Sequence, residues 1–166
     1  MTSVLIAGVG GQGSIFAARV LGETALRKGL RVRGSETIGM AQRGGSVVSH
    51  VRMGETEIAS PLTPPGAVDA LIALEPTEGE RSRHFLRAGG LFVCCGDARR
   101  AEIIRTCGAK SLNAALLGMA ARLGAFPFDV EDLAETLRAF GRPQFAEMNR
   151  KALYMGAEMA GGIPCD

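Results

Sequence analysis

The sequence lacks the cysteine patterns of metal centres. Its four cysteines, Cys94, Cys95, Cys107 and Cys165, show neither the C-x-x-C spacing of zinc sites nor the runs that hold iron–sulfur clusters. Free cysteine packs readily in protein cores, so we predict that Cys94 and Cys95 are small buried residues of a strand. Any cluster that serves this protein is expected on another chain.

An excess of charge of one sign and long apolar runs are also missing. Lys and Arg number 19 against 17 Asp and Glu, and the charged fraction is 22% against an apolar fraction of 46%. This balance excludes a disordered chain and a strongly basic nucleic-acid surface. No stretch approaches the about 20 apolar residues of a membrane span, and the run at 4–9 is too short for a signal-peptide core. We therefore expect a soluble, cytoplasmic protein with no membrane or nucleic-acid partner.

The order of apolar patterns predicts one α/β domain over residues 1–166. An apolar run at 4–7, helical spacing over 14–28 and a second run at 30–36 form a β-α-β unit. Such a unit predicts a mostly parallel, Rossmann-like sheet with flanking helices and a right-handed crossover. In the helix, the residues expected to face the sheet are Ile15, Ala18, Gly22, Ala25 and Leu26.

The later elements follow from the same signals. We predict strands at 46–53, 67–74 and 91–95, a return strand after a turn at 54–57, and helices at 75–90, 111–125, 129–141 and 144–160. Residues 46–53 and the return strand would form a hairpin inserted into the sheet. The last three helices form a helical C-terminal tail that is expected to cover one face and one edge of the sheet.

The glycines that follow the first strand allow two interpretations. Gly8, Gly10 and Gly13 fit the G-x-G-x-x-G pattern, and Glu36 lies near the end of the second strand, where an acidic residue would hold a ribose hydroxyl. Backbone N–H groups and the helix dipole at this position favour an anion. The same glycines also serve a close turn with no ligand. Ser14 stands where a P-loop requires lysine, which argues against a nucleoside triphosphatase.

A second glycine segment, residues 34–54, is polar and lies between two strands. Gln42 and Arg43 come directly before a Gly-Gly pair, so this turn can bring side chains and backbone to a ligand. Arg43 has either a structural or interface role or an anion-binding role. In the strand at 46–53, His50 and Arg52 share one face. The plainer interpretation of His50 is a surface or capped strand residue, because no nucleophile or metal partner lies near it in the sequence.

The segments GVGGQG (8–13) and SETIGMAQRGGSVVSHVRMG (35–54) together resemble the gamma-type subunit or domain of 2-oxoacid:acceptor (ferredoxin) oxidoreductases. Within that family the sequence is most similar to the smaller subunit of the indolepyruvate type. The likeness continues through residues 73–81, 112–124 and 147–156. Between residues 95 and 112 the chain is shorter than the family pattern, in which an additional strand and loop are expected.

The resemblance implies a subunit of an enzyme that decarboxylates an aryl 2-oxoacid such as indolepyruvate, transfers the acyl group to coenzyme A and passes electrons to ferredoxin. It places thiamine diphosphate, magnesium and the 4Fe-4S clusters in a large alpha subunit. This chain has no G-D-G segment for thiamine diphosphate; GDA at 96–98 is the nearest approach. The chain alone is expected to have no turnover and to form a homodimer.

By position, the resemblance implies two loops in the site, formed by Gly8, Gly10, Gly11, Gln12 and Gly13 and by Gln42, Arg43, Gly44, Gly45 and Ser46. One or both loops are expected to hold the phosphates of coenzyme A, with Glu36, His50 and Glu75 as further possible site residues. No metal ligand and no catalytic base are expected from this chain.

Three other functions are compatible with the residues. A free-standing NAD(P)-binding oxidoreductase would use Glu36 to hold the ribose. An adenylating enzyme of the ubiquitin-activating type also carries a G-x-G-G-x-G loop. A non-catalytic assembly or binding module would have the same fold without the catalytic function.

Overall fold

The sheet of this computed structural model is mixed, with one strand reversed. The structure describes residues 1–39, 44–140 and 143–161. The strands are β1 (Thr2–Val9), β2 (Arg31–Ile38), β3 (Ser46–Gly54), β4 (Val68–Ala73) and β5 (Leu86–Cys94), in the order β2-β3-β1-β4-β5. β4 pairs in parallel with β1 and β5, whereas β3 is antiparallel to β1 and β2. Only β3 therefore opposes the common direction, and the α/β fold class is confirmed.

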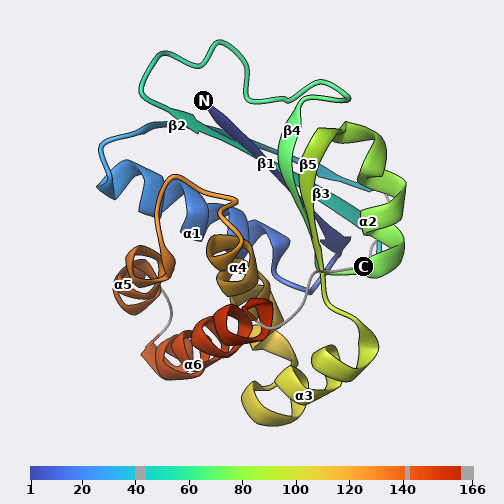
Figure 1. The fold of residues 1–166 in the computed structure, drawn as a ribbon, viewed down its shortest axis with the longest axis vertical. Helices are drawn as coiled ribbons and strands as arrows, with labels where there is room; N and C mark the ends of the chain where they lie inside the picture. Colours follow the sequence, from blue (N-terminus) through green and yellow to red (C-terminus); the bar gives the residue numbers. More distant parts are fainter. Residues whose placement is uncertain (40–43, 141–142, 162–166) are drawn as a thin grey trace.

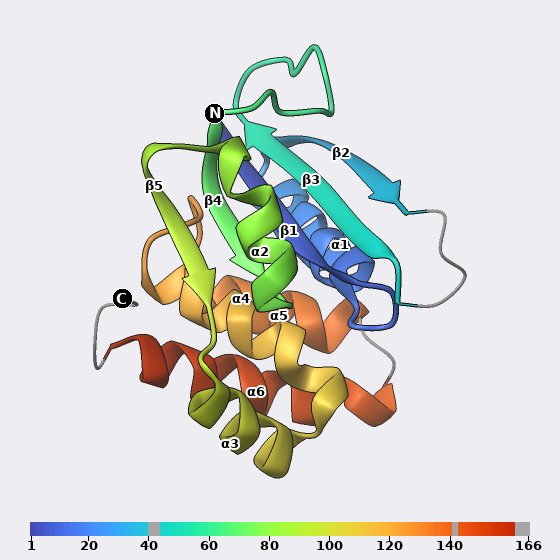
Figure 2. The same ribbon diagram turned by 90° about the vertical axis from the view of Figure 1, so that its right-hand side faces the viewer.

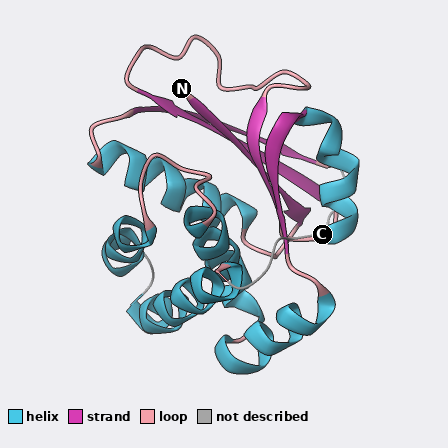
Figure 3. Cartoon of the chain, in the orientation of Figure 1, coloured by secondary structure: helices cyan, strands magenta, loops and turns pink. Residues whose placement is uncertain are grey.

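The inserted hairpin differs from the predicted one. Residues 55–67 form a loop and not a return strand (Figure 3). β3 instead forms its hairpin with β2, which Gly39 N–H closes by donating to the Ser46 carbonyl at 2.8 Å. β3 also pairs with β1 along the whole length of β1, from Thr2 opposite Met53 to Val9 opposite Ser46. The two strands of the predicted β-α-β unit are thus parallel but separated by β3.

Helices cover the two faces of the sheet unequally. They are α1 (Ser14–Arg27), α2 (Pro76–Ser82), α3 (Asp97–Cys107), α4 (Leu112–Arg122), α5 (Val130–Phe140) and α6 (Pro143–Ala160). In Figures 1 and 2, α2 lies on one face of the sheet, and α1, α4, α5 and α6 lie on the other. The prediction that the C-terminal helices cover one face is confirmed.

The predicted bounds of one helix and of the strand that follows it were wrong. The helix predicted at 75–90 ends at Ser82, and β5 begins at Leu86. Leu86 already pairs with Val68, and a shift in register follows before Leu91 pairs with Ala70. The glycines at 89 and 90 therefore lie in an irregular part of a strand and do not end a helix. The region that we expected to be shortened contains α3, a helix that the sequence analysis did not predict.

The buried face of α1 is also rotated from the predicted one. Ala18 and Ala25 are buried as expected, but Leu26 is 56% exposed. Val20 and Leu21 are fully buried instead. α1 contacts α4 and α5 as well as the sheet, so its buried stripe is wider and shifted toward those helices.

The main core lies between the sheet and the larger helical layer. It includes most of α4, whose residues 112–120 are all buried. A smaller cluster on the α2 face is built around Leu5 and Leu71, with Phe85 and Phe92 packed against it. α4 is thus an interior helix, and its first turn lies beside the loop that follows β1.

Candidate functional site

The glycine loop lies where the sheet changes its direction of winding. β1 and β4 are parallel neighbours, with Ala7 opposite Ala73 at their carboxyl ends. The chain leaves β1 toward α1 on one face and leaves β4 toward α2 on the other (Figures 1 and 2). In open α/β sheets, ligands bind outside the carboxyl ends of the strands at such a switch point. The loop at 10–13 follows β1 there, and Glu75 follows β4.

Gln12 folds back over the end of β1. Its side-chain Oε1 accepts a hydrogen bond from Val9 N–H at 3.0 Å, and its own N–H donates to the Val9 carbonyl at 3.2 Å. Its Nε2 donates to Glu75 Oε2 at 3.4 Å. A Cβ atom on Gly8 would lie 2.9 Å from Gln12 Oε1 and 3.1 Å from Leu74 Cβ. The first glycine of the pattern therefore makes room for the Gln12 side chain.

Gly13 ends the loop and begins α1. Its φ of +82° lies in the left-handed region, and no side chain caps the helix. Asn113 of α4 donates from Nδ2 to the carbonyls of Gln12 and Gly13 at 3.3 and 3.4 Å, and a Cβ on Gly13 would overlap that amide. Glycine is thus required here for both its conformation and the close approach of Asn113. The first-turn N–H groups of α1, which have no side-chain cap, can serve an anion.

The second glycine loop lies beside the first. Gly10 N–H donates to the Gly45 carbonyl at 2.9 Å, and Ser46 is opposite Val9 in the sheet. The structure therefore brings together the described parts of the two predicted loops. Gln42 and Arg43 lie outside the described residues, so their role stays a prediction.

Two hollows flank the first loop. One, of about 540 Å³, extends from the loop along the first turns of α1 to Arg19 and Phe140. The other, of about 470 Å³, lies between the loop and the side chains of Lys110, Asn113 and Phe145. Each hollow has one basic side chain, which adds positive charge near the start of α1. The sequence analysis missed Lys110 and Asn113 because no local pattern links them to a loop about 100 positions away.

Glu75, a possible site residue by sequence, lies at the switch point after β4. It is the residue before α2, and its carboxylate is 3.6 Å from Arg100 Nη2 of α3. Arg100 Nη1 also donates to the Leu74 carbonyl at 2.8 Å. The unpredicted helix α3 thereby supplies a residue to the edge of the site.

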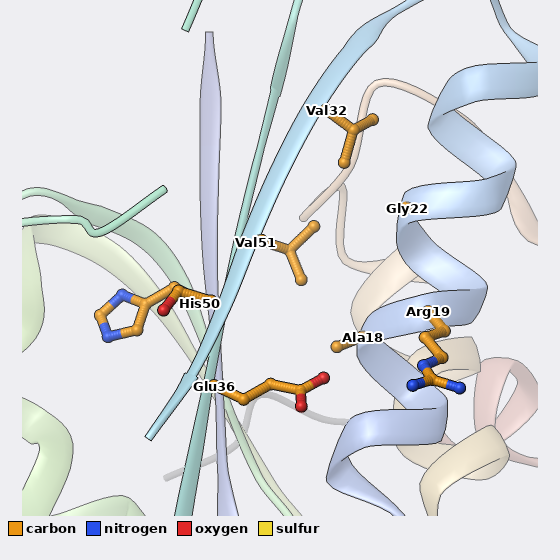
Figure 4. Close-up of a pocket in the computed structure, with 9 residues that line it drawn as sticks. Ala18, Arg19, Gly22, Val32, Glu36, His50 and Val51 are labelled. Carbon is orange, nitrogen blue, oxygen red and sulfur yellow. The ribbon is translucent and has the colours of Figure 1, made fainter. Parts of the chain in front are cut away.

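Glu36 lies away from the glycine loop. It pairs with Ser49 of β3, which in turn pairs with Ile6 of β1, so two strand spacings, roughly 9–10 Å, separate Glu36 from β1. Its side chain points instead toward α1, across a hollow of about 370 Å³ from Arg19 (Figure 4). Glu36 could hold a ribose beside the first loop only if β2 were the neighbour of β1. In this sheet β3 lies between them.

His50 points to the opposite face of the sheet (Figure 4). It is 4% exposed, its Nδ1 accepts from Thr63 N–H at 3.3 Å, and its ring meets Phe85 edge-on with centroids 5.5 Å apart. Burial lowers the pKa of His50. Arg52, on the same face as predicted, donates to the Ser60 carbonyl at 2.8 Å. Both side chains hold the loop at 55–67 against the sheet.

The described ranges offer no grouping of metal ligands. In residues 1–39, 44–140 and 143–161, no three His, Cys, Asp or Glu side chains gather closely enough to hold an ion. Cys95 and Cys107 are buried, and Cys94 is half-buried at the end of β5. Over the same ranges, no helix combines the length and apolar character needed to cross a bilayer.

Comparison with known proteins identifies the family. Residues 3–159 match the family described as pyruvate ferredoxin/flavodoxin oxidoreductase. A protein of Archaeoglobus fulgidus named indolepyruvate oxidoreductase subunit IorB is 32% identical over 192 aligned residues, which cover 95% of this chain and 94% of that protein. The alignment is longer than the 166 residues of this chain, so the relative carries insertions.

Solved structures show the same fold. The gamma subunit of a keto/oxoacid ferredoxin oxidoreductase from Geobacter sulfurreducens has a TM-score of 0.78 at 24% identity, with 98% of this chain and 100% of that chain covered. A 2-oxoglutarate:ferredoxin oxidoreductase from Magnetococcus marinus has a TM-score of 0.82 at 20% identity, with 98% of this chain and 31% of that chain covered. The resemblance inferred from the glycine segments is confirmed, and the chain belongs to the pyruvate ferredoxin/flavodoxin oxidoreductase family.

Proposed function

We propose that the chain is the small subunit of a thiamine-dependent 2-oxoacid:ferredoxin oxidoreductase that acts on indolepyruvate or a related aryl 2-oxoacid. In this reaction the 2-oxoacid loses carbon dioxide, its acyl group passes to the thiol of coenzyme A, and two electrons leave to ferredoxin. The observation that carries the proposal is the near-complete coverage, in both directions, between this chain and a protein named as an indolepyruvate oxidoreductase subunit.

The paired glycine loops would bind the phosphates of coenzyme A. Support comes from the uncapped start of α1 and from Arg19 and Lys110 in the flanking hollows, since phosphate is favoured by free N–H groups and basic side chains. A part of the Magnetococcus marinus enzyme, 31% of its chain, has a similar fold, and that enzyme was solved with coenzyme A bound. Arg43 would add a further contact from the second loop.

The remaining cofactors would belong to a large subunit. Thiamine diphosphate, with magnesium, would stabilise the carbanion left when the 2-oxoacid loses carbon dioxide. No three His, Cys, Asp or Glu side chains gather in the described residues of this chain, and the sequence has no G-D-G segment. Following the resemblance, we assign it, together with the 4Fe-4S clusters, to the alpha subunit, and we place the complex in the cytoplasm. The chain's own part is to bind and orient coenzyme A.

The alternative functions receive less support from the geometry. A free-standing NAD(P) enzyme would need an acidic residue next to the first loop, and β3 separates Glu36 from it. An adenylating enzyme would show ATP-dependent pyrophosphate exchange. A purely structural module would leave the two hollows and their basic side chains without a role.

The test is co-expression with the candidate large subunit. Oxidation of indolepyruvate would be followed with a viologen acceptor, with and without coenzyme A and with and without this chain. We expect activity only when both chains and coenzyme A are present. A stable large subunit that is equally active alone would overturn the proposal.

The substrate and loop assignments can be tested in the same complex. The ratio kcat/KM for indolepyruvate, phenylpyruvate, pyruvate and 2-oxoglutarate ranks the substrates, and a preference for a non-aryl acid would contradict the aryl assignment. Arg43→Ala should raise the KM for coenzyme A. Lys28→Gln, which removes an exposed ion pair with Asp132, is the matched control. An unchanged KM in the Arg43 variant would exclude the second loop.

A further inference from the structure

The side chain of Gln12 is held from both ends of its amide. Its Oε1 accepts from Val9 N–H at 3.0 Å, and its Nε2 donates to Glu75 Oε2 at 3.4 Å. Gly8 leaves room for the Gln12 side chain in this position, because a Cβ on residue 8 would lie 2.9 Å from Gln12 Oε1. The Gln12 side chain, and with it the conformation of the first loop, is therefore held in part by Glu75, which lies outside the loop.

We propose that Glu75 is a positioning residue that, together with Arg100, holds the Gln12 amide on Val9 and so fixes the first glycine loop. Glu75 precedes α2 at the end of β4, a rigid strand between β1 and β5. A carboxylate is a strong acceptor for the Gln12 NH2 group, so it sets which way the amide is turned. With the NH2 group directed to Glu75, Oε1 is left to face the Val9 N–H.

Arg100 completes this arrangement from α3. Its Nη1 donates to the Leu74 carbonyl at 2.8 Å, which anchors the guanidinium at the end of β4, and its Nη2 lies 3.6 Å from Glu75 Oε2. Both side chains are largely covered, with 23% of Arg100 and 31% of Glu75 exposed. Arg100 offsets the negative charge of Glu75, which would otherwise repel an anion at the start of α1.

The role deepens the proposed function, and its effect on coenzyme A rests on that proposal. The effect on the loop does not, because it concerns contacts within this chain. The resemblance assigns no role to α3. In this arrangement α3 carries Arg100 to Glu75. The contacts at 3.4 and 3.6 Å are longer than ideal, so the expected effects are moderate.

The experiment compares Glu75→Ala, Glu75→Gln and Glu80→Ala. Glu75→Ala removes the acceptor, whereas Glu75→Gln keeps an oxygen that accepts from Gln12 but loses the charge opposite Arg100. Glu80 is the matched control, because it is a nearby carboxylate, in α2, whose exposed ion pair is with Arg83 and not with the loop. Amide hydrogen exchange of the full chain and the KM for coenzyme A in the assembled complex are measured for each.

We expect Glu75→Ala to speed exchange of Val9 N–H about threefold to tenfold, the range that corresponds to one hydrogen bond, and to raise the KM for coenzyme A by a similar factor with kcat little changed. Glu75→Gln should recover most of the protection of Val9, and Glu80→Ala should match the parent. Unchanged exchange at Val9 in Glu75→Ala overturns the positioning role. Faster exchange with an unchanged KM supports that role and counts instead against coenzyme A at this loop.

Discussion

Gly10 N–H donates a hydrogen bond to the carbonyl of Gly45 at 2.9 Å, across the gap between the two glycine segments. The two residues are 35 positions apart, and the bond exists because β3 lies antiparallel against β1, with Val9 opposite Ser46. The described parts of the two glycine loops therefore meet at the carboxyl end of β1.

Gly13 and Gly10 should respond differently to alanine. Gly13→Ala forces a Cβ into left-handed backbone and onto the Asn113 amide, so we expect a loss of about 1–3 kcal/mol of stability. Gly10→Ala brings a Cβ no closer than 3.8 Å to any neighbouring atom and should stay within about 0.5 kcal/mol of the parent. Denaturant unfolding measures both. Equal losses would contradict both the left-handed backbone strain at Gly13 and the Asn113 contact.

The crossing of α4 and α6 predicts a second contrast between glycines. A Cβ on Gly118 would overlap the Leu153 carbonyl, so Gly118→Ala must separate the helices, at a cost of about 1–3 kcal/mol. Gly22→Ala, in α1, meets Val32 at an ordinary 3.5 Å and should gain up to about 1 kcal/mol from helix propensity. Thermal unfolding of the two variants measures this difference in stability. A Gly118 variant as stable as the Gly22 variant would contradict the close crossing of α4 and α6.

His50 should make stability depend on pH. Its pKa is lowered in the folded chain by burial, so the unfolded chain binds the proton more readily and stability rises with pH. The contribution is fully present above the ordinary pKa of 6.5 and is lost as the pH falls below it toward the folded value. Urea unfolding between pH 7.5 and 5 should show this decline.

The matched histidine variants identify the source of that decline. His50→Asn keeps an acceptor for Thr63 N–H but cannot titrate in this range, so we expect a smaller fall in stability on acidification. His84→Asn changes the exposed neighbour of Phe85 and should keep the slope of the parent. An unaltered slope in the His50 variant would assign the pH dependence to other groups.

Glu36 provides a direct test of the NAD(P) alternative. β3 lies between β2 and β1, so we expect a flat fluorescence titration of the chain with NADH and with NADPH. Saturable binding that is lost in Glu36→Ala and kept in Glu23→Ala, a change to a half-buried carboxylate that pairs with Arg27, would restore that alternative. The titration needs only this chain and is independent of the partner.

The sequence by itself determined most of the elements and the class of the fold. Apolar runs and helical spacing located β1, β3, α1, α4, α5 and α6, because these signals depend on neighbours within a few positions. The glycine segments pointed to the two loops and to the family, and they placed Gly13 at the start of α1. The same local reasoning failed at residues 83–90, where a register shift in β5 stands in place of the last turns of a helix.

Only the tertiary structure decided which residues meet at the loops. The insertion of β3 between β1 and β2 removed Glu36 from the loop and brought Gly45 to Gly10. Asn113 and Arg100 reach the same edge from α4 and α3, which follow the loop by about 90 to 100 residues. Strand order and helix packing depend on the burial of apolar surface over the whole chain, and no short pattern records that balance.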